Sequence, residues 1–455
     1  MADLGTYKLL ADHDPEDEIQ FMKGEIEGQL DDKLSKDTIV IVGSGTAGLI
    51  LSRKLDEEKF NVVVISPEET SPRTSLLASA ACGLVDFSLA EEQIRHKSRQ
   101  LTYYKARVEE VDFIRKVCRC RSACDVTGGK DRLFEVKYDR LILAPGCATH
   151  TFDVPGADEH ALFLGTAADA RHIHHRLTQL LELTSIPHVS ADEQRRLLHI
   201  VIVGSGPTGI GLAGKLSDLI DSDLATLYPD LKGKMSISIH DSPAYHPGKF
   251  EAALRHYCLE NGTKRHVQLF PDSRVTKVEA DSITTEALGR APCGMAVWTA
   301  GNRTCALVHK LNVAKTSNSD PGVQRMLTDE YLRILRPGED QQKAMSHVYA
   351  IGDAADINDG SLPPTAEVAR QKADYLAGVL NSEFDDGESK FAYHQQHGLL
   401  GWLGGNDGVV QGQTDWTPSR AWAAWQSGNS NSLFARSWRH HLSIAIHWFA
   451  GWLRG

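Results

Sequence analysis

Short apolar runs that end in glycine recur along the chain, and each predicts a buried strand that leads into a tight turn. The first is Thr38–Gly48, where four apolar β-forming residues precede the glycines, and His199–Gly209 repeats this pattern much later. A third run, His347–Ile357, is an apolar strand that ends in Gly-Asp. Because a glycine turn after an apolar strand commonly opens a helix, the first two runs predict strand–turn–helix units.

The glycine spacing in these two units is typical of dinucleotide-binding βαβ folds. The first glycine makes the turn, the second lets the backbone approach a pyrophosphate, and the third lets the helix pack closely on the strand. The phosphates then lie on free N–H groups at a helix N-terminus. One such run alone could be an ordinary glycine-rich turn, but two favour two nucleotide sites. The expected cofactor-binding residues are Gly43, Ser44, Gly45 and Gly48 in the first unit and Gly204, Gly206 and Gly209 in the second.

Residues at the ends of other strands are expected to complete the two cofactor sites. Ser66 ends the strand Asn61–Ser66, where an acidic residue often holds the adenosine ribose. Asp241 ends the corresponding strand of the second unit, where a carboxylate would bind ribose hydroxyls and repel a 2′-phosphate, so NADH is favoured over NADPH. A strand-end turn aspartate is the alternative for Asp241. Asp353 would accept hydrogen bonds from a flavin, and tight turns add Gly146, Gly301 and Gly352.

Composition narrows the function classes. A net charge of -11 argues against a nucleic-acid partner. Eight cysteines are too few for a disulfide scaffold in 455 residues, which favours a reducing compartment. The one cysteine cluster, Cys118 to Cys124, has no second Cys or His pair at ligand spacing, so no metal is expected. Within Thr74–Asp86 only Cys82 is present, and a single thiol cannot form the cycling disulfide of a disulfide reductase.

The last part of the chain has a different character. Seven of the eight tryptophans lie from Trp402 onward. Within 432–455, aromatic and aliphatic residues including Trp438 and Phe449 fall on one helical face and polar residues including Arg436 and His447 on the other. This pattern predicts an amphipathic helix that lies in a membrane interface and is too short and polar to span the bilayer. Docking on the protein's own core or on a homodimer partner is the alternative.

Together these stretches resemble the type II (alternative) NADH:quinone oxidoreductases, single-subunit flavoenzymes of respiratory membranes. The narrower parts of the resemblance are PGADEHALFL, LPPTAEVARQKADYL and SWRHHLSIAIHWF. It implies an α/β fold with two Rossmann-like domains, as in glutathione reductase, plus a C-terminal membrane-anchoring helix. It also implies bound FAD, reduction of the flavin by NADH, and reoxidation by a quinone or quinone-like small molecule without proton pumping.

The resemblance and the runs above give the expected domain bounds. We expect an acidic N-terminal tail at 1–37, a split FAD-binding domain at 38–175 and 307–380, an NADH-binding domain at 195–306, and a membrane-association segment at 381–455. The family implies a peripheral position on the mitochondrial inner membrane. The acidic tail has no arginine and no readable presequence, so a cytoplasmic location is the alternative.

Three departures from the family pattern concern the reaction site. The family's second turn continues with a glutamate that helps position the nicotinamide, and Gly211 stands at that position here. A glutamine pair near the flavin and the quinone corresponds to Glu367 and Gln371, so one amide has become a carboxylate. The aromatic segment after the second strand is replaced by EETSPRTSLL. Gly211, Glu367 and Gln371 are therefore the candidate catalytic positions, and a specialised acceptor or weakened NADH turnover is the alternative function.

Deleting the chain from Ser432 is expected to release the protein from membranes, because it removes the tryptophan-lined face. Reduction of long-tailed quinones should weaken, while reduction of short soluble quinones is retained. Liposome co-sedimentation and assays with both quinone types measure these effects. A truncated protein that still sediments with liposomes would place the anchor elsewhere.

Overall fold

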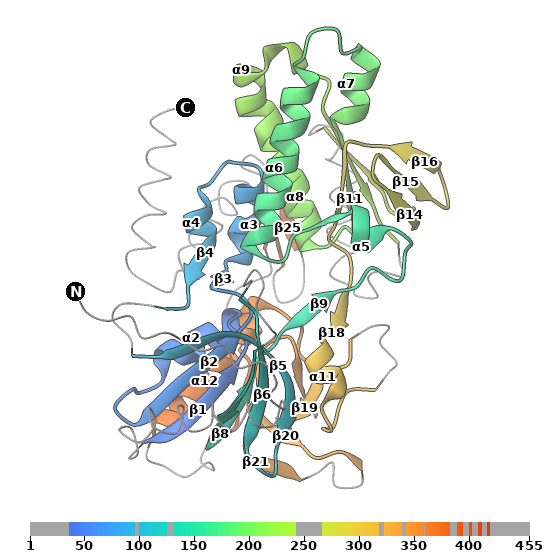
Figure 1. Ribbon diagram of the computed structural model, residues 1–455. Helices are drawn as coiled ribbons and strands as arrows, with labels where there is room; N and C mark the ends of the chain where they lie inside the picture. The colour runs from blue at the N-terminus through green and yellow to red at the C-terminus, as the bar shows by residue number, and fades with distance from the viewer. Residues whose placement is uncertain are drawn as a thin grey trace, which may run out of the picture.

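The computed structural model describes residues 36–95, 100–124, 132–242, 266–317, 323–338, 343–358, 360–382 and 389–394, and the backbone of three short strands beyond them. Two α/β units dominate, one built on a ten-stranded sheet and one on a five-stranded sheet (Figure 1). The three short strands, β23 (Leu400–Trp402), β24 (Gly408–Gln411) and β25 (Trp416–Pro418), form a separate antiparallel sheet.

The large sheet contains the first glycine run. Its strands β21, β8, β1, β2 and β5 are parallel, so their carboxyl ends meet at one edge. In sheet order the strands are β22 (Ala355–Ile357), β19 (Met326–Thr328), β20 (Arg333–Leu335), β21 (Ala344–Ala350), β8 (Arg140–Leu143), β1 (Asp37–Val42), β2 (Phe60–Ser66), β5 (Thr102–Asp112), β6 (Val117–Ser122) and β7 (Leu133–Lys137).

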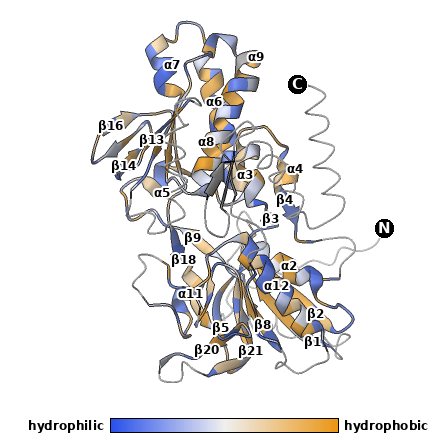
Figure 2. Ribbon diagram, turned by 180° about the vertical axis from the view of Figure 1, so that it is seen from behind, coloured by the Kyte–Doolittle hydropathy of each residue, from blue (hydrophilic) through white to orange (hydrophobic). Residues whose placement is uncertain are grey.

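Two helices cover one face of this sheet. Helices α2 (Thr46–Lys54) and α12 (Ala366–Asn381) pack side by side against β1 and β2, and their inward faces are apolar (Figure 2). Leu49 and Leu376 are fully buried there. On the other face β5, β6 and β7 pack with the short helix α11 (Ala306–Lys310) around a second apolar cluster. Burial on both faces explains why β1 and β2 are continuous apolar runs rather than alternating ones.

The small sheet contains the second glycine run and is entirely parallel. Its order is β10 (Leu162–Phe163), β17 (Met295–Trp298), β11 (His199–Val203), β12 (Ser236–His240) and β13 (Val267–Phe270). Helices α6 (Ala167–Thr184), α8 (Pro207–Leu219) and α3 (Thr74–Ala81) share the core on one face. The antiparallel strands β14 (Val275–Glu279), β15 (Ser282–Thr285) and β16 (Gly289–Pro292), with α5 (Ala157–His160), lie on the other.

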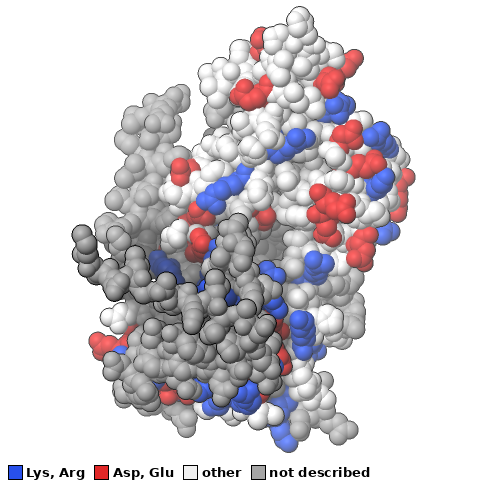
Figure 3. Space-filling view, viewed as in Figure 1, with Lys and Arg blue, Asp and Glu red and all other residues white. Residues whose placement is uncertain are grey.

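Two small β-structures lie between the units. The antiparallel pair β9 (Cys147–Thr149) and β18 (Asn302–Thr304) carries the chain from one sheet to the other and back (Figure 1). Strands β3 (Thr70–Pro72) and β4 (Glu91–Gln93) form an antiparallel pair near α2. Helices α3 and α4 (Phe87–Ala90) lie between them in the chain. On the face seen in Figure 3, acidic and basic side chains are interspersed over the small-sheet unit.

The strands and helices predicted around the two glycine turns are present, and the polar stretch 178–196 is largely helical. Helix α6 continues to Thr184, and α7 (Ala191–Leu197) follows it. Helix α6 is amphipathic despite its many charged residues. Leu177 and Leu181 face the small-sheet core, while their polar neighbours face solvent. After α8 the chain continues through a π-turn (220–224), α9 (Ala225–Leu227) and a 3-10 turn (229–231).

The predicted C-terminal amphipathic helix lies outside the described residues. Among the described helices, none is both long and apolar enough to cross a bilayer. The large sheet takes its strands from 37–143 and 326–357, and the small sheet from 162–298. The domain bounds given above remain predictions.

Candidate functional site

The first glycine turn joins β1 to α2 and is closed by backbone packing. Gly43 has φ 103°, and a Cβ on it would lie 2.2 Å from the Ala144 carbonyl oxygen. A Cβ on Gly48 would lie 2.0 Å from the Gly43 oxygen, whereas one on Gly45 would meet nothing within 4 Å. Gly45 is also the N-cap of α2, without a side-chain cap and without an acid in the first turn. The turn therefore leaves free N–H groups and open space where a phosphate can bind.

The end of β21 lies against this turn. A Cβ on Gly352 would be 3.3 Å from the Ala47 side chain of α2. Asp353 follows, its backbone oxygen accepts from the Cys147 thiol at 3.5 Å, and no described residue donates to its carboxylate. Burial raises the pKa of Asp353, against the lowering effect of Arg325 and Lys372. A partly buried carboxylate with free acceptor positions suits a ligand that brings hydroxyl groups.

The Ser66 hydroxyl already has hydrogen-bond partners inside the protein. The Ser44 hydroxyl donates to the Ser66 hydroxyl at 2.8 Å, and both serines are buried. Tyr103 donates its hydroxyl to the backbone oxygens of Ser66 at 3.1 Å and Glu68 at 2.8 Å. These contacts fix the end of β2 and leave Glu68 as the first exposed acid beyond it.

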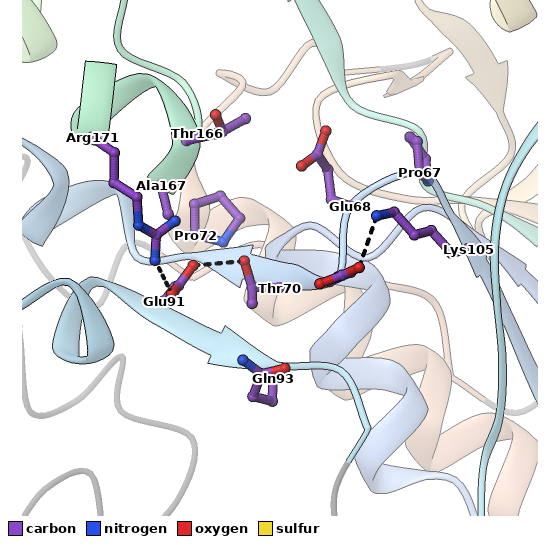
Figure 4. A pocket seen from close by; sticks show the side chains of 12 residues that line it. Pro67, Glu68, Thr70, Pro72, Glu91, Gln93, Lys105, Thr166, Ala167 and Arg171 are labelled. Carbon is purple, nitrogen blue, oxygen red and sulfur yellow. Dashed lines mark hydrogen bonds and ion pairs between the residues drawn. The ribbon is translucent and has the colours of Figure 1, made fainter. Parts of the chain in front are cut away.

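A cavity of about 280 Å³ opens at this point, between the end of β2, the paired strands β3 and β4, and the start of α6 (Figure 4). Lys105 pairs with Glu69 at 2.7 Å, and Arg171 pairs with Glu91. Glu68 also lines the cavity, and its carboxylate has no partner among the described residues. A free carboxylate beside the first turn fits ribose hydroxyls. Ser66 is the residue named for this position from the sequence, and Glu68, two residues later, is the carboxylate that lines the cavity.

The second glycine turn repeats the first. Gly204 has φ 106° and a Cβ on it would lie 2.8 Å from the Ala300 nitrogen, while one on Gly209 would lie 2.1 Å from the Gly204 oxygen. Gly206 is the N-cap of α8, again without a side-chain cap or a first-turn acid. Gly301, at φ 73°, packs against Phe152. Gly146 has φ 68° and open space beside its Cα.

The two units match residue for residue at the strand end. Val42 pairs with Ile65 and Val203 with His240, so Asp241 occupies in the small sheet the place of Ser66 in the large one. Asp241 is fully buried, and the Ser205 hydroxyl donates to its Oδ2 as Ser44 does to Ser66. Asp241 is a candidate from the sequence, and Ser205 joins it only through this contact in the structure.

A neutral histidine precedes Asp241. His240 is buried, lies near the Ser273 hydroxyl at 2.9 Å, and stacks on Phe270 at 4.8 Å between ring centroids. Burial, with a smaller contribution from the charge of His199, lowers the pKa of His240 to about 4. His240 therefore gives Asp241 no cationic neighbour at neutral pH, which disfavours a 2′-phosphate here.

The candidate catalytic residues fall into two groups. On α12, Gln371 Nε2 donates to Glu367 Oε1 and to the His394 oxygen, both at 2.7 Å, and its Oε1 accepts from the His394 N–H at 3.0 Å. Arg370 also binds Glu367 at 2.7 Å. Gly211 lies on α8, and a Cβ there would meet no described atom within 4 Å. The structure thus joins Glu367 to Gln371, while no contact links Gly211 to them.

The cysteines show no sign of redox or metal chemistry in the described ranges. Cys82 is buried, and burial raises its thiol pKa far above the usual range. Cys118 and Cys120 are buried on β6. No group of three or more potential ligands that could hold a metal occurs among the residues described.

Comparisons with known proteins agree with the two-unit fold. The family model described as pyridine nucleotide-disulphide oxidoreductase matches residues 37–373. An internal alternative NAD(P)H-ubiquinone oxidoreductase A1 of Solanum tuberosum is 32% identical over 366 residues, which cover 77% of this chain and 70% of that protein. The external alternative NAD(P)H-ubiquinone oxidoreductase B2 of Arabidopsis thaliana is 30% identical over 347 residues, covering 74% and 58%.

Among solved structures, NDH2 from Plasmodium falciparum in complex with NADH has a TM-score of 0.77 at 20% identity, covering 91% of this chain and 98% of that one. This likeness shows the fold. The matched region spans only 62% of a Schizosaccharomyces pombe relative that is 32% identical, and 58% of the Arabidopsis protein.

Two glycines of the first turn should respond oppositely to alanine. Gly48→Ala forces a Cβ against the Gly43 carbonyl and is expected to destabilise the fold by about 2–3 kcal/mol. Gly45→Ala meets no protein atom, so it should leave the melting temperature of the FAD-free protein unchanged but weaken FAD binding. Thermal unfolding and FAD titration measure the two effects. Equal loss of stability in both variants would contradict the assignment of the open side to the ligand.

Proposed function

Because the chain belongs to the pyridine nucleotide-disulphide oxidoreductase family, within its alternative (type II) NADH:quinone oxidoreductases, we propose that it transfers electrons from NADH through FAD to a quinone, without pumping protons. The observation that carries the proposal is the pair of matching glycine turns, of which one lies beside the free carboxylate of Asp353 and the other beside Asp241. One turn provides for a resident dinucleotide and the other for an exchanging one.

The residues at the large-sheet turn fit FAD. The uncapped start of α2 would bind the pyrophosphate, Glu68 the adenosine ribose, and Asp353 the hydroxyls of the ribityl chain. Bound FAD would supply the two-electron chemistry that the side chains lack. The α12 N-terminus, capped by Thr365, would direct its dipole toward the ring.

The residues at the small-sheet turn fit NADH. The α8 N-terminus would bind the pyrophosphate, and Asp241 would accept from the ribose hydroxyls. Since Asp241 is fully buried and bonded to Ser205, binding requires this carboxylate to turn toward the ribose. A 2′-phosphate would meet the Asp241 charge with no compensating cation from neutral His240, so NADH is the preferred donor.

Glu367 and Gln371 are assigned to the acceptor half of the reaction. Their mutual hydrogen bond and the clamp on the His394 backbone hold both side chains in place near the start of α12. Glu367 brings a charge that Arg370 balances. The open space at Gly211 and this charged pair favour, as a second candidate, a specialised acceptor that resembles a quinone.

The cellular setting follows the same reasoning. The tryptophan-rich C-terminal helix would bind the protein peripherally to a membrane that contains the quinone, and the family resemblance points to the mitochondrial inner membrane. A homodimer formed through that segment is the alternative.

The proposal is tested with the purified full chain. It should be yellow with releasable FAD, and anaerobic NADH should bleach the flavin before added quinone restores the colour. A protein that binds no added FAD would end the proposal. Bleaching by NADH without reoxidation by any quinone would favour another acceptor.

Asp241→Asn should reduce the preference for NADH. The wild type is expected to favour NADH about tenfold to a hundredfold in the rate of flavin reduction at low nucleotide concentration. Removing the charge should bring the two rates within a few-fold. Ser205→Ala is the matched control, because it removes the hydrogen bond and keeps the carboxylate, so the preference should persist. Stopped-flow absorbance measures both, and an unchanged preference in Asp241→Asn would contradict this role.

Gly211→Glu should accelerate flavin reduction by NADH. No described atom lies within 4 Å of a Cβ at Gly211. A carboxylate there could hold the nicotinamide and stabilise its developing positive charge, which would raise the rate of flavin reduction about tenfold to a hundredfold. FAD content should not change. Glu367→Gln should instead alter reoxidation by quinone. Anaerobic rapid mixing separates the two half-reactions, and a slower or unchanged reduction in folded Gly211→Glu would refute the inherited role.

A further inference from the structure

Lys372 is a fully buried lysine on the inner side of α12. Its ammonium donates to the Ala355 carbonyl oxygen at 3.1 Å. Fully buried lysines are rare unless a negative charge balances them. Burial lowers the pKa of Lys372 to about 8, and the carboxylates of Asp356 and Asp353 oppose that shift.

Asp356 is already satisfied by other groups. Arg325 pairs with it at 2.7 Å, and the Ser361 hydroxyl donates to it at 2.8 Å. Backbone N–H groups of Ile357 and Leu362 each donate at 3.0 Å. Asp356 therefore has an ion-pair partner in Arg325 and three further hydrogen-bond donors. Arg325 also lowers the pKa of Asp353, so Lys372 is the second cation that acts on that carboxyl group.

Asp353 is the remaining negative charge. No described donor reaches its carboxylate, and it lies two residues before the carbonyl that binds Lys372. Gly352, its neighbour, packs on Ala47 of the first glycine turn. Arg325 and, to a smaller extent, Lys372 are thus the two cations that favour the ionised form of the Asp353 carboxyl group.

We propose that Lys372 is a positioning residue of the flavin site, whose buried positive charge keeps the Asp353 carboxylate ionised and ready to bind the hydroxyl groups of FAD. This inference rests on the proposed function. It assigns the lysine no contact with the reacting atoms, and it predicts that FAD affinity depends on the charge state of Lys372.

Lys372→Met retains the length of the side chain and removes the charge. Replacing a buried ion by an apolar group of similar volume is often neutral or stabilising, so the FAD-free variant should melt at or above the wild-type temperature. Its FAD dissociation constant should rise about tenfold. Lys315→Met is the matched control, since Lys315 also donates to one backbone carbonyl, of His309, but has no effect on Asp353. Its FAD affinity should equal the wild type's.

A pH profile separates a charge effect from a packing effect. The charged and titratable groups around Lys372 are Asp353, Asp356 and Arg325, and burial brings the pKa of Lys372 itself to about 8. Wild-type FAD affinity should be constant below about pH 8 and fall as the pH rises through it, because the protonated lysine is the form that favours FAD. Lys372→Met should show no such fall. Titrations of FAD-free protein by flavin fluorescence quenching give both curves.

A double-mutant cycle with Asp353→Asn tests the route of the effect. If Lys372 acts through Asp353, Lys372→Met should change FAD affinity less than twofold in the Asp353→Asn background. The proposal is overturned if Lys372→Met binds FAD as the wild type does, or if its effect is equally large without the carboxylate. A wild type that binds no FAD would instead defeat the proposed function itself.

Discussion

Both nucleotide sites depend on the close approach of two backbone segments at the end of a buried parallel strand. At the large sheet a Cβ on Gly48 would come within 2.0 Å of the Gly43 oxygen, and at the small sheet Gly209 and Gly204 repeat the contact at 2.1 Å. Only glycine permits it. This contact directs the start of α2 and α8 at open space beyond the sheet, so the helix dipole meets the ligand rather than a side chain.

The two turns differ in the residue at the end of the neighbouring strand, which is Ser66 in the large sheet and Asp241 in the small one. Ser44 bonds to neutral Ser66, while Ser205 bonds to charged Asp241. In the first unit the carboxylates lie elsewhere, at Glu68, two residues after the end of β2, and at Asp353, which follows β21. In the second the carboxylate lies within the strand-end position itself.

Two sets of buried charged residues lie at the edge of the large sheet. Arg325 and Asp356 neutralise each other with full hydrogen bonding, which ties β19 to β22. By contrast, Lys372 donates to one backbone carbonyl oxygen, of Ala355, and no described residue donates to the Asp353 carboxylate. A fully hydrogen-bonded ion pair stabilises structure, whereas a buried charged group with few hydrogen bonds retains capacity for a ligand. Buried charged groups whose hydrogen-bonding capacity is not filled by the protein therefore mark candidate functional positions.

The sequence by itself determined the strands, the glycine turns and the family, because apolar periodicity and glycine spacing are local properties. It also located Asp241 and Asp353 at strand ends. Tertiary structure alone decided that the Ser44 hydroxyl bonds to Ser66, that Glu68 lines the cavity, and that buried Lys372 donates to the Ala355 carbonyl oxygen. These are contacts between segments far apart in the chain, and α12 joins β1 and β2 only when the sheet forms. No local pattern carries such pairing.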